Sequence, residues 1–374
     1  MIILHVVEPF AAGIAVFVKT LAESMPHDTH LILHGERRQV MSAREVKKIF
    51  PQKNVRFIRW HSAQRSINPI KDFRALQELY RILQRLKRRN LVDAVHLHSS
   101  KSGLLGRLAC RMAGVNQVVY TPNGAPFLAG KNPVSNFLYR SLEKLGSGLG
   151  GEVVCCSQSE LQAYQRLGIK ARYINNGVAV SAAPVSAIAD KLPGKFRIVT
   201  SGRIEHQKNP QAFNQIAQYF AEFEQFEFIW AGDGQDRHVL TAPNVQVTGW
   251  LNAVDCKGII ASADLYLSTS LYEGLSFAVL EALALQRPLL LSQCIGNKDA
   301  VRNGLNGDLF TTEQDAINKI LSYYNNQDML VVMGDFSQKI AHQDFDMQRN
   351  FENYRQVYSG DFRPEQLMSK LSVN

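Results

Sequence analysis

The 374-residue sequence lacks any apolar run of the roughly 20 residues needed to span a bilayer. Its first ten residues, MIILHVVEPF, contain no basic segment and no cleavage site, so we do not expect a signal peptide. Cysteine is scarce. The five residues include the neighbours Cys155 and Cys156, and none has the spacing of zinc ligands. No disulfide framework is therefore predicted, and a reducing cytoplasm is the expected location.

Acidic residues are few in the first half of the chain. Residues 1–194 contain 27 Lys and Arg against 12 Asp and Glu, whereas residues 195–374 contain 15 against 21. Such a basic half indicates contact with an anionic partner, and nucleic acid, anionic lipid and phosphorylated substrates all qualify. The alternative is a set of solvated helix faces.

The most informative stretch, residues 264–293, predicts a strand–helix–strand unit. Asp264–Ser268 alternates like a strand, and Ser276 is a suitable N-cap for an apolar helix over residues 277–285. Arg287-Pro288 ends the helix, and the apolar run Leu289–Ser292 suits a buried parallel strand.

Two carboxylates accompany this unit. Glu273 precedes the predicted helix, whose N-terminus offers free N–H groups and partial positive charge for a phosphate. Glu281 lies over a turn into the helix, where it can accept hydrogen bonds from sugar hydroxyls. The alternative is a surface helix with two solvated Glu side chains.

Glu273, seven residues and Glu281, with Gly274-Leu275-Ser276 after the first Glu, resemble the motif of the retaining family-four glycosyltransferases. The resemblance implies the α/β GT-B fold, in which two Rossmann-like domains face across a cleft. It implies an acceptor-binding domain at 1–180, a linker at 181–194, a nucleotide-sugar-binding domain at 195–345, and a segment at 346–374 whose helix returns to the first domain. Glu273 then orients the donor sugar, and Glu281 binds the ribose.

Further donor-binding residues follow from the same resemblance. Arg203 and Lys208 match the loop that grips the donor diphosphate, where fixed cations stabilise the leaving group's charge. Gly232-Asp233-Gly234 resembles the family's turn near the nucleotide. The first loop, Glu8–Gly13, resembles the Gly-rich turn near the donor phosphates through Gly13, but it has no G-x-G-x-x-G pattern. Gly274, Leu275 and Ser276 complete the expected donor site.

Two loops of the first domain are expected at the site. One carries the acceptor contacts, and the other carries Asn123, which the resemblance places beside the donor sugar as a candidate catalytic residue with Glu273. His98-Ser99-Ser100-Lys101 ends a predicted strand before a helix, and His98, Ser100 and Lys101 are the candidate acceptor contacts. His98 is alternatively a structural histidine. Thr121-Pro122-Asn123-Gly124 resembles a family loop that usually has His where this chain has Asn123. Asn can hydrogen-bond a sugar hydroxyl but cannot act as a base.

These features predict a metal-independent retaining hexosyltransferase with no cofactor. The donor is a nucleotide-diphosphate sugar, expected to be UDP-linked, and the acceptor a polyprenyl-diphosphate-linked saccharide of bacterial O-antigen or capsule synthesis. Asp344-Phe345-Asp346 has the D-x-D form of a metal motif but lies outside the expected cleft loops. A nucleotide-sugar epimerase or hydrolase of the same fold remains an alternative. A nucleic-acid-binding protein would explain the basic half but neither the two Glu residues nor the Arg-Lys loop.

We expect peripheral attachment to the anionic inner face of the plasma membrane. A helix predicted at 71–90 has an apolar stripe and a basic face, and residues 127–149 combine apolar and basic residues, as an amphipathic helix lying on lipid does. Both segments are alternatively packed helices of the first domain.

Overall fold

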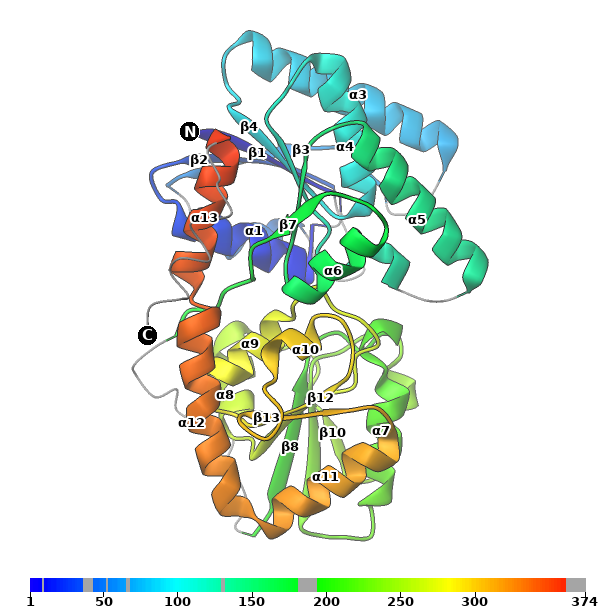
Figure 1. The fold of residues 1–374 in the computed structure, drawn as a ribbon, viewed down its shortest axis with the longest axis vertical. Helices are drawn as coiled ribbons and strands as arrows, with labels where there is room; N and C mark the ends of the chain where they lie inside the picture. Colours follow the sequence, from blue (N-terminus) through cyan, green and yellow to red (C-terminus); the bar gives the residue numbers. More distant parts are fainter. Residues whose placement is uncertain are drawn as a thin grey trace.

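The computed structural model describes residues 1–8, 10–35, 43–51, 53–64, 68–128, 132–180 and 194–360. Within them the chain forms two α/β domains, each with one parallel sheet, stacked along the long axis of the molecule (Figure 1). Apart from Gly194, the predicted linker at 181–194 lies outside the described residues, as do residues 361–374 of the predicted C-terminal segment.

The first domain contains a seven-stranded sheet in the order β3-β2-β1-β4-β5-β6-β7. Its strands are β1 (Ile2–Val7), β2 (Thr29–His34), β3 (Val55–Arg59), β4 (Ala94–His98), β5 (Val118–Thr121), β6 (Glu152–Cys155) and β7 (Ala171–Tyr173). The helices are α1 (Ala12–Ser24), α2 (Ala43–Lys48), α3 (Pro69–Arg88), α4 (Ser100–Ala113), η1 (Pro126–Leu128), α5 (Pro133–Gly148) and α6 (Gln158–Arg166). Central strands such as β1 and β4 are almost entirely buried, because helices cover both faces of the sheet.

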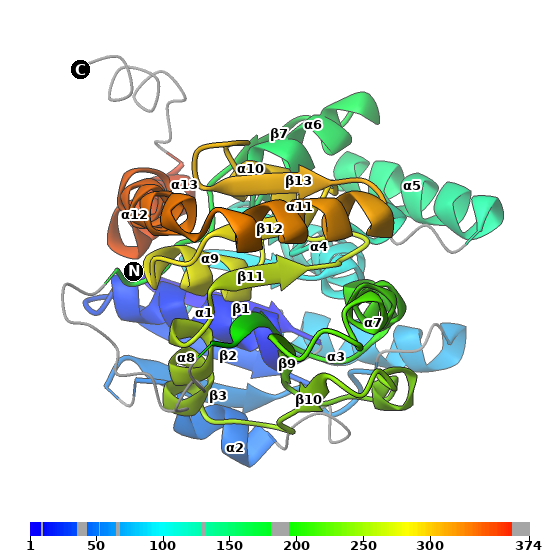
Figure 2. The same ribbon diagram turned by 90° about the horizontal axis from the view of Figure 1, so that it is seen from below.

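The second domain contains a six-stranded sheet in the order β10-β9-β8-β11-β12-β13, part of which is visible from below in Figure 2. Its strands are β8 (Phe196–Ser201), β9 (Phe226–Ala231), β10 (Val245–Val247), β11 (Leu265–Ser268), β12 (Leu289–Ser292) and β13 (Gly307–Phe310). The helices are η2 (His206–Lys208), α7 (Pro210–Tyr219), η3 (Arg237–Val239), α8 (Ala253–Ala261), α9 (Phe277–Ala284), α10 (Asn297–Ala300), α11 (Glu313–Asn325) and α12 (Gln327–Asp344). The predicted strand–helix–strand unit is thus β11, α9 and β12.

The last described helix, α13 (Met347–Ser359), crosses back to the first domain as predicted (Figure 1). Phe351, Tyr354 and Tyr358 are buried in a core cluster that also includes residues of β1 and α1. Gln117 Nε2 donates a hydrogen bond to the Val357 carbonyl oxygen at 2.6 Å. The fold is therefore the GT-B arrangement expected from the resemblance.

Four histidines lie under α13 on one face of the first sheet. His5 and His96 are paired across β1 and β4, and His30 and His98 extend the cluster along β2 and β4. His5 bridges two of them, with Nδ1 3.1 Å from His98 Nε2 and Nε2 2.9 Å from His30 Nδ1. His96 Nδ1 lies 2.6 Å from the Tyr358 hydroxyl. This last contact joins the histidine cluster to the crossover helix.

The histidine cluster is uncharged at neutral pH. Burial, with the neighbouring imidazoles, holds the pKa of His5 and of His96 well below the usual 6.5. Burial also lowers the pKa of His30 to about 4 and that of His98 to about 3. Neutral imidazoles can hydrogen-bond one another without placing charge in the core.

Candidate active site

The site lies where two loops meet at the carboxyl end of the second sheet. Strands β8 and β11 are neighbours although α7, β9, β10 and α8 separate them in the sequence, so the strand order reverses between them. Ligands of open α/β sheets bind at such a switch point. The loop after β8 carries Arg203 and Lys208, and the loop after β11 carries Glu273 to Ser276.

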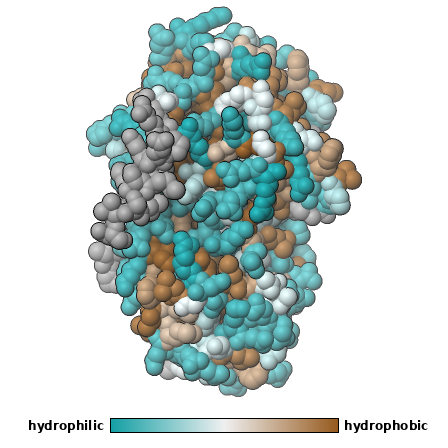
Figure 3. Space-filling model, in the orientation of Figure 1, coloured by the Kyte–Doolittle hydropathy of each residue, from teal (hydrophilic) through white to brown (hydrophobic). Residues whose placement is uncertain are grey.

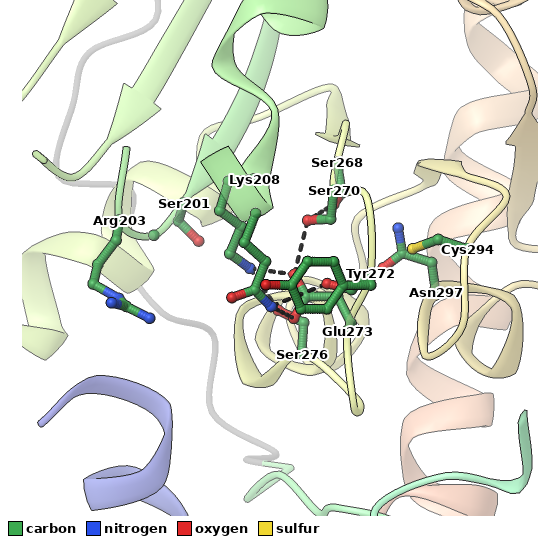
Figure 4. A network of polar contacts seen from close by, with 12 residues as sticks. Ser201, Arg203, Lys208, Ser268, Ser270, Tyr272, Glu273, Ser276, Cys294 and Asn297 are labelled. Carbon is green, nitrogen blue, oxygen red and sulfur yellow. Dashed lines mark hydrogen bonds and ion pairs between the residues drawn. The ribbon is translucent and has the colours of Figure 1, made fainter. Parts of the chain in front are cut away.

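Lys208 and Glu273 form the centre of the site (Figure 4). Lys208 Nζ donates to Glu273 Oε1 at 2.7 Å, and the Ser270 hydroxyl donates to the same oxygen at 2.8 Å. Gln207 Nε2 lies 3.4 Å from Glu273 Oε2. Glu273 is only 6% exposed, so the carboxylate is held in one orientation by a cation and neutral donors.

Arg203 lies apart from this pair in Figure 4, although it comes from the same loop as Lys208. Its guanidinium forms an ion pair with Glu205 at 2.7 Å and is about one-quarter exposed. The structure therefore brings Lys208, but not Arg203, into contact with Glu273. The sequence spacing does not reveal that Glu205, two residues from Arg203, is its partner.

Two predicted donor-binding glycines have a packing role in this structure. A Cβ on Gly232 would collide with the carbonyl oxygen of Gly202, and one on Gly234 would collide with that of Ile204. Both glycines thus allow the loop after β9 to approach the loop that carries Arg203. Gly13 is different, because an added Cβ there meets open space at the start of α1.

The loop at Gly274 touches the first domain. A Cβ on Gly274 would lie 2.7 Å from the backbone nitrogen of Gly124, so only glycine allows this approach. Next to it, Asn176 Nδ2 donates to the carbonyl oxygen of Leu275 at 2.8 Å. The Glu273–Ser276 loop is therefore wedged between the two domains.

Ser276 precedes the first residue of α9, as predicted, but its side chain does not cap the helix. The hydroxyl instead lies 3.5 Å from Lys208 Nζ. A Ser that caps a helix turns its oxygen toward the N–H groups of the first turn, whereas this one faces the cation.

Glu281 is half-buried on α9 and forms no hydrogen bond with another described residue. Burial raises the pKa of its carboxyl, while the charges of Lys257 on α8 and Lys19 on α1 act in the opposite direction. It is the fifth residue of α9, whereas Glu273 lies in the loop before that helix. Its oxygens are free to accept hydrogen bonds from a ligand.

The predicted acceptor contacts near the end of β4 have other partners. His98 is fully buried in the histidine cluster, so it does not face a ligand in this structure. Lys101 Nζ forms an ion pair with Asp72 of α3 at 2.6 Å, and Ser100 is half-buried at the start of α4. The structure thus does not bring these three residues together with Glu273.

Asn123, in contrast, belongs to the loop that reaches the second domain. Its φ of 55° is left-handed, a conformation that Asn tolerates better than most residues. Its Nδ2 donates to the Thr121 carbonyl oxygen at 3.2 Å, and its Oδ1 lies 3.5 Å from the Cys156 sulfur. Through the Gly124–Gly274 contact, Asn123 lies at the boundary between the acceptor and donor loops.

Sequence reasoning missed Glu160, which holds this loop from beneath. The fully buried carboxylate accepts hydrogen bonds from the backbone N–H groups of Cys156 at 2.8 Å and Gly124 at 3.0 Å. Burial raises its pKa to about 7, against the opposing effect of these N–H donors. The Ser157-x-x-Glu160 spacing of a capping box was the available signal, since Ser157 Oγ accepts from the Glu160 N–H.

The start of α6 also binds the second domain. Ser159 N–H donates to Asp299 Oδ1 at 2.9 Å, and the Ser159 hydroxyl donates to the other carboxylate oxygen. The same hydroxyl accepts from the Gly296 N–H at 2.9 Å. A Cβ on Gly296 would lie 2.7 Å from the Glu273 Cβ. The first turn of α6 therefore contacts the Asn123–Gly124 loop through Glu160 and the loop at Gly296 through Ser159.

One group among the described residues has metal-ligand proximity, namely His5, His96 and His98, whose ligand atoms lie within 4.8 Å of one another. His96 already uses both ring nitrogens, with Tyr358 and with Thr121 at 2.7 Å, and His5 uses both of its own. His98 also uses Nε2 in its contact with His5. Hydrogen bonding explains this cluster better than metal ligation does.

The D-x-D string has structural partners. Asp344 pairs with Arg302 at 3.2 Å, and Asp346 caps α13 by accepting from the Arg349 N–H at 2.8 Å. Neither carboxylate is part of the Glu273 site.

Comparisons with known proteins agree with this architecture. The family model for glycosyltransferase family 4 matches residues 11–182, and the one for glycosyl transferases group 1 matches residues 195–326. A UDP-Gal:alpha-D-GlcNAc-diphosphoundecaprenol alpha-1,3-galactosyltransferase of Escherichia coli is 31% identical over 289 residues, which cover 70% of this chain and 71% of that protein. The chain therefore belongs to the family-four glycosyltransferases and is a glycosyltransferase with the GT-B fold.

Solved structures show the same fold at low identity. A sucrose-phosphate synthase from Thermosynechococcus elongatus superposes with a TM-score of 0.78 at 16% identity, covering 99% of this chain and 100% of that one. Anabaena HepE in complex with UDP and glucose gives 0.75 at 17% identity, covering 96% and 99%.

Proposed function

We propose that this glycosyltransferase moves a hexose from a UDP-sugar to a hydroxyl of a polyprenyl-diphosphate-linked saccharide, with retention at the anomeric carbon and without a metal. The setting is bacterial O-antigen or capsule synthesis. The proposal is supported by the Escherichia coli relative, whose name specifies UDP-Gal and a GlcNAc-diphosphoundecaprenol acceptor. The observation that carries it is the Lys208–Glu273 pair at the switch point, next to the Asn123–Gly124 loop.

Lys208 has the position and charge to bind the donor diphosphate. When the nucleotide diphosphate leaves, negative charge develops on its oxygens, and a fixed cation stabilises that charge. Its contact with Glu273 holds this cation at the switch point, where the donor diphosphate is expected to bind. Arg203 reaches the diphosphate only by leaving Glu205. With the N-terminus of α9, these cations supply the charge stabilisation that a metal ion provides in other transferases.

Glu273 orients the donor sugar in this mechanism and does not attack it. Its Oε1 already accepts hydrogen bonds from Lys208 and Ser270, which lowers its reactivity as a nucleophile. Asn123 cannot accept a proton as a base. We therefore propose front-face transfer: the bond from the anomeric carbon to the diphosphate oxygen breaks, the bond to the acceptor oxygen forms on the same face, and the acceptor proton passes to the diphosphate oxygen.

The protein acts, in this proposal, at the cytoplasmic face of the plasma membrane as a peripheral protein. None of the helices in the described part of the chain is both long and apolar enough to cross a bilayer. A lipid-linked acceptor presents its reacting sugar at the membrane surface, and the basic first domain is suited to anionic headgroups.

A donor screen followed by product analysis tests the proposal. The full chain is incubated with a panel of nucleotide sugars, and those that raise its melting temperature are assayed with a short-chain diphosphate-linked GlcNAc acceptor. We expect an acceptor-dependent product that keeps the donor's anomeric configuration by NMR, and equal activity in EDTA. Release of free sugar or an epimerised nucleotide sugar without acceptor would favour a hydrolase or epimerase. An inverted product, or a glycosyl adduct on Glu273 in mass spectra, would refute the mechanism.

A further inference from the structure

Helix α5 buries a charged residue and exposes most of its large apolar residues. The residues buried on α5 are Glu143 and Gly146, with Asn136 and Tyr139 half-buried on the same side. Four of its six large apolar side chains point outward, with Val134 78%, Phe137 73% and Leu145 62% exposed, and Leu138 exposed beside them, whereas Tyr139 and Leu142 are half-buried. These four recur at positions i, i+3, i+4 and i+11 and so form one stripe. A core-facing helix has the opposite arrangement.

Buried polar contacts fix this orientation. Glu143 Oε1 accepts a hydrogen bond from the Tyr120 hydroxyl at 2.8 Å, and Glu143 Oε2 lies 3.6 Å from an Arg107 nitrogen of α4. Arg107 packs over the Tyr120 ring at 4.4 Å and leaves no room for a side chain at Gly146. Turning α5 about its axis would leave the Arg107 charge unpaired in the core, which is strongly unfavourable. The apolar stripe is therefore held in its outward position.

Figure 3 shows hydrophobic side chains at the edge of the first domain where Figure 1 places the start of α5. The exposed charges on α5 are Arg140 and Lys144, while its one acidic residue, Glu143, is buried. An apolar stripe on a helix whose exposed charges are all cationic suits the interface of an anionic bilayer better than it suits water. A second copy of the chain would bring like charges of this patch together in a symmetric dimer.

The chain also connects this patch to the catalytic loop. The Asn123–Gly124 turn continues through η1 (Pro126–Leu128), which packs against α5. A bilayer that contacts α5 is thus close in the fold to the loop that meets Glu273 and Gly274. This position suits an acceptor whose lipid part stays in the membrane while its sugar reaches the site.

We propose that α5 is the membrane-docking element, with the stripe formed by Val134, Phe137, Leu138 and Leu145 inserted into the interface of an anionic bilayer. This inference rests on the proposed function, because the lipid-linked acceptor explains why the enzyme binds a membrane. It goes further in predicting that attachment has an apolar component that salt does not remove. Purely electrostatic attachment is screened beyond about 8–10 Å at physiological ionic strength.

Vesicle sedimentation of the full chain tests the docking element. Phe137→Ser combined with Leu138→Ser should lower partitioning onto phosphatidylglycerol-containing vesicles about tenfold or more, because two large apolar side chains no longer leave water. Val331→Ser combined with Val332→Ser, exposed on α12 of the second domain, is the matched control and should not change partitioning. Equal partitioning of the parent and the α5 variant would overturn the inference.

Two further measurements separate the alternatives. In Phe137→Trp, the new fluorophore should be quenched by brominated lipid, whereas that in Val332→Trp should not. A Phe137→Trp signal insensitive to brominated lipid, or lipid-free dimers that the α5 double variant dissociates, would overturn the inference in favour of a protein interface. Transfer to a short-chain water-soluble acceptor should be unchanged in the α5 double variant. A parent protein that transfers the sugar to this acceptor but does not bind the vesicles refutes only the docking proposal. A parent protein that transfers no sugar refutes the proposed function.

Discussion

Acidification below pH 6.5 should destabilise the first domain, because four buried histidines are neutral in the fold and protonated in the unfolded chain. A histidine whose pKa is lowered in the fold contributes its full stabilisation above 6.5, its pKa in the unfolded chain. That contribution is lost as the pH falls from 6.5 toward the pKa in the folded protein. The pKa in the folded protein is about 4 for His30 and about 3 for His98. Each of these residues therefore lowers the free energy of unfolding by about 2 kcal/mol when the pH falls from 7.5 to 5. His5 and His96 act in the same direction.

Burial raises the pKa of Glu143, Glu152 and Glu281, which opposes this effect, and Glu160 opposes it too. Its pKa is raised from 4.5 to about 7, so the folded protein gains about 2 kcal/mol as the pH falls from 7.5 to 5. Over the same pH range, His30 and His98 together lower the free energy of unfolding by about twice that amount, and His5 and His96 lower it further. Urea unfolding followed by circular dichroism should therefore give a lower free energy of unfolding at pH 5 than at pH 7.5.

Substitutions test the assignment of this pH dependence to the cluster. His98→Asn should reduce the pH-dependent loss by about 2 kcal/mol. His27→Gln, at an exposed position, should leave the loss unchanged. A protein that is equally stable at pH 5 and pH 7.5, or one in which both variants behave alike, would refute the reasoning.

Three other predictions concern the active site. Lys208→Ala should lower turnover by roughly a hundredfold to a thousandfold, because a cation that stabilises the leaving group is lost. Lys319→Ala, in a half-buried ion pair on α11, is the control, and near-parental turnover of the folded Lys208 variant would remove it from the site. Glu281→Gln should weaken UDP binding by about 1–3 kcal/mol without lowering the free energy of unfolding, because its carboxylate forms no hydrogen bond with another described residue and burial disfavours its charge; unchanged affinity by calorimetry would contradict the ribose role. Glu160→Gln should reduce kcat/KM for the acceptor saccharide while UDP affinity stays the same, because one of the two backbone N–H groups that Glu160 binds is left without a hydrogen-bond partner. An equal loss of UDP affinity would count against a role confined to the Asn123–Gly124 loop.

Local patterns predicted the elements that carry the site. The apolar run Leu289–Ser292 after Arg287-Pro288 is strand β12, and the helix expected over 277–285 is α9, one residue shorter. These segments are specified by composition and by residues that end helices, which are local properties. The crossover of the last helix came from the family resemblance and not from any local pattern.

Side-chain partners were not predictable, because they depend on which segments meet in space. Glu273 is paired with Lys208, 65 positions away, and Asp299 with Ser159, 140 positions away. For α5, periodicity defines an apolar and a polar face but not which one turns inward. The buried Arg107 on another helix decides that question.

The crossover of α13 has a consequence for the order in which the protein forms during synthesis. Phe351, Tyr354 and Tyr358 complete the core over the histidines of β1 and β4, yet the ribosome makes them more than 250 residues after β4. The first domain, although translated first, cannot close this face until the second domain has been synthesised. Nascent chains arrested at residue 345 should therefore have a first domain that proteases cleave readily. In chains extended far enough for α13 to leave the ribosome, the first domain should resist proteases. The elements of the second domain form one contiguous stretch, from β8 to α12, so that domain can complete its fold before the first domain does.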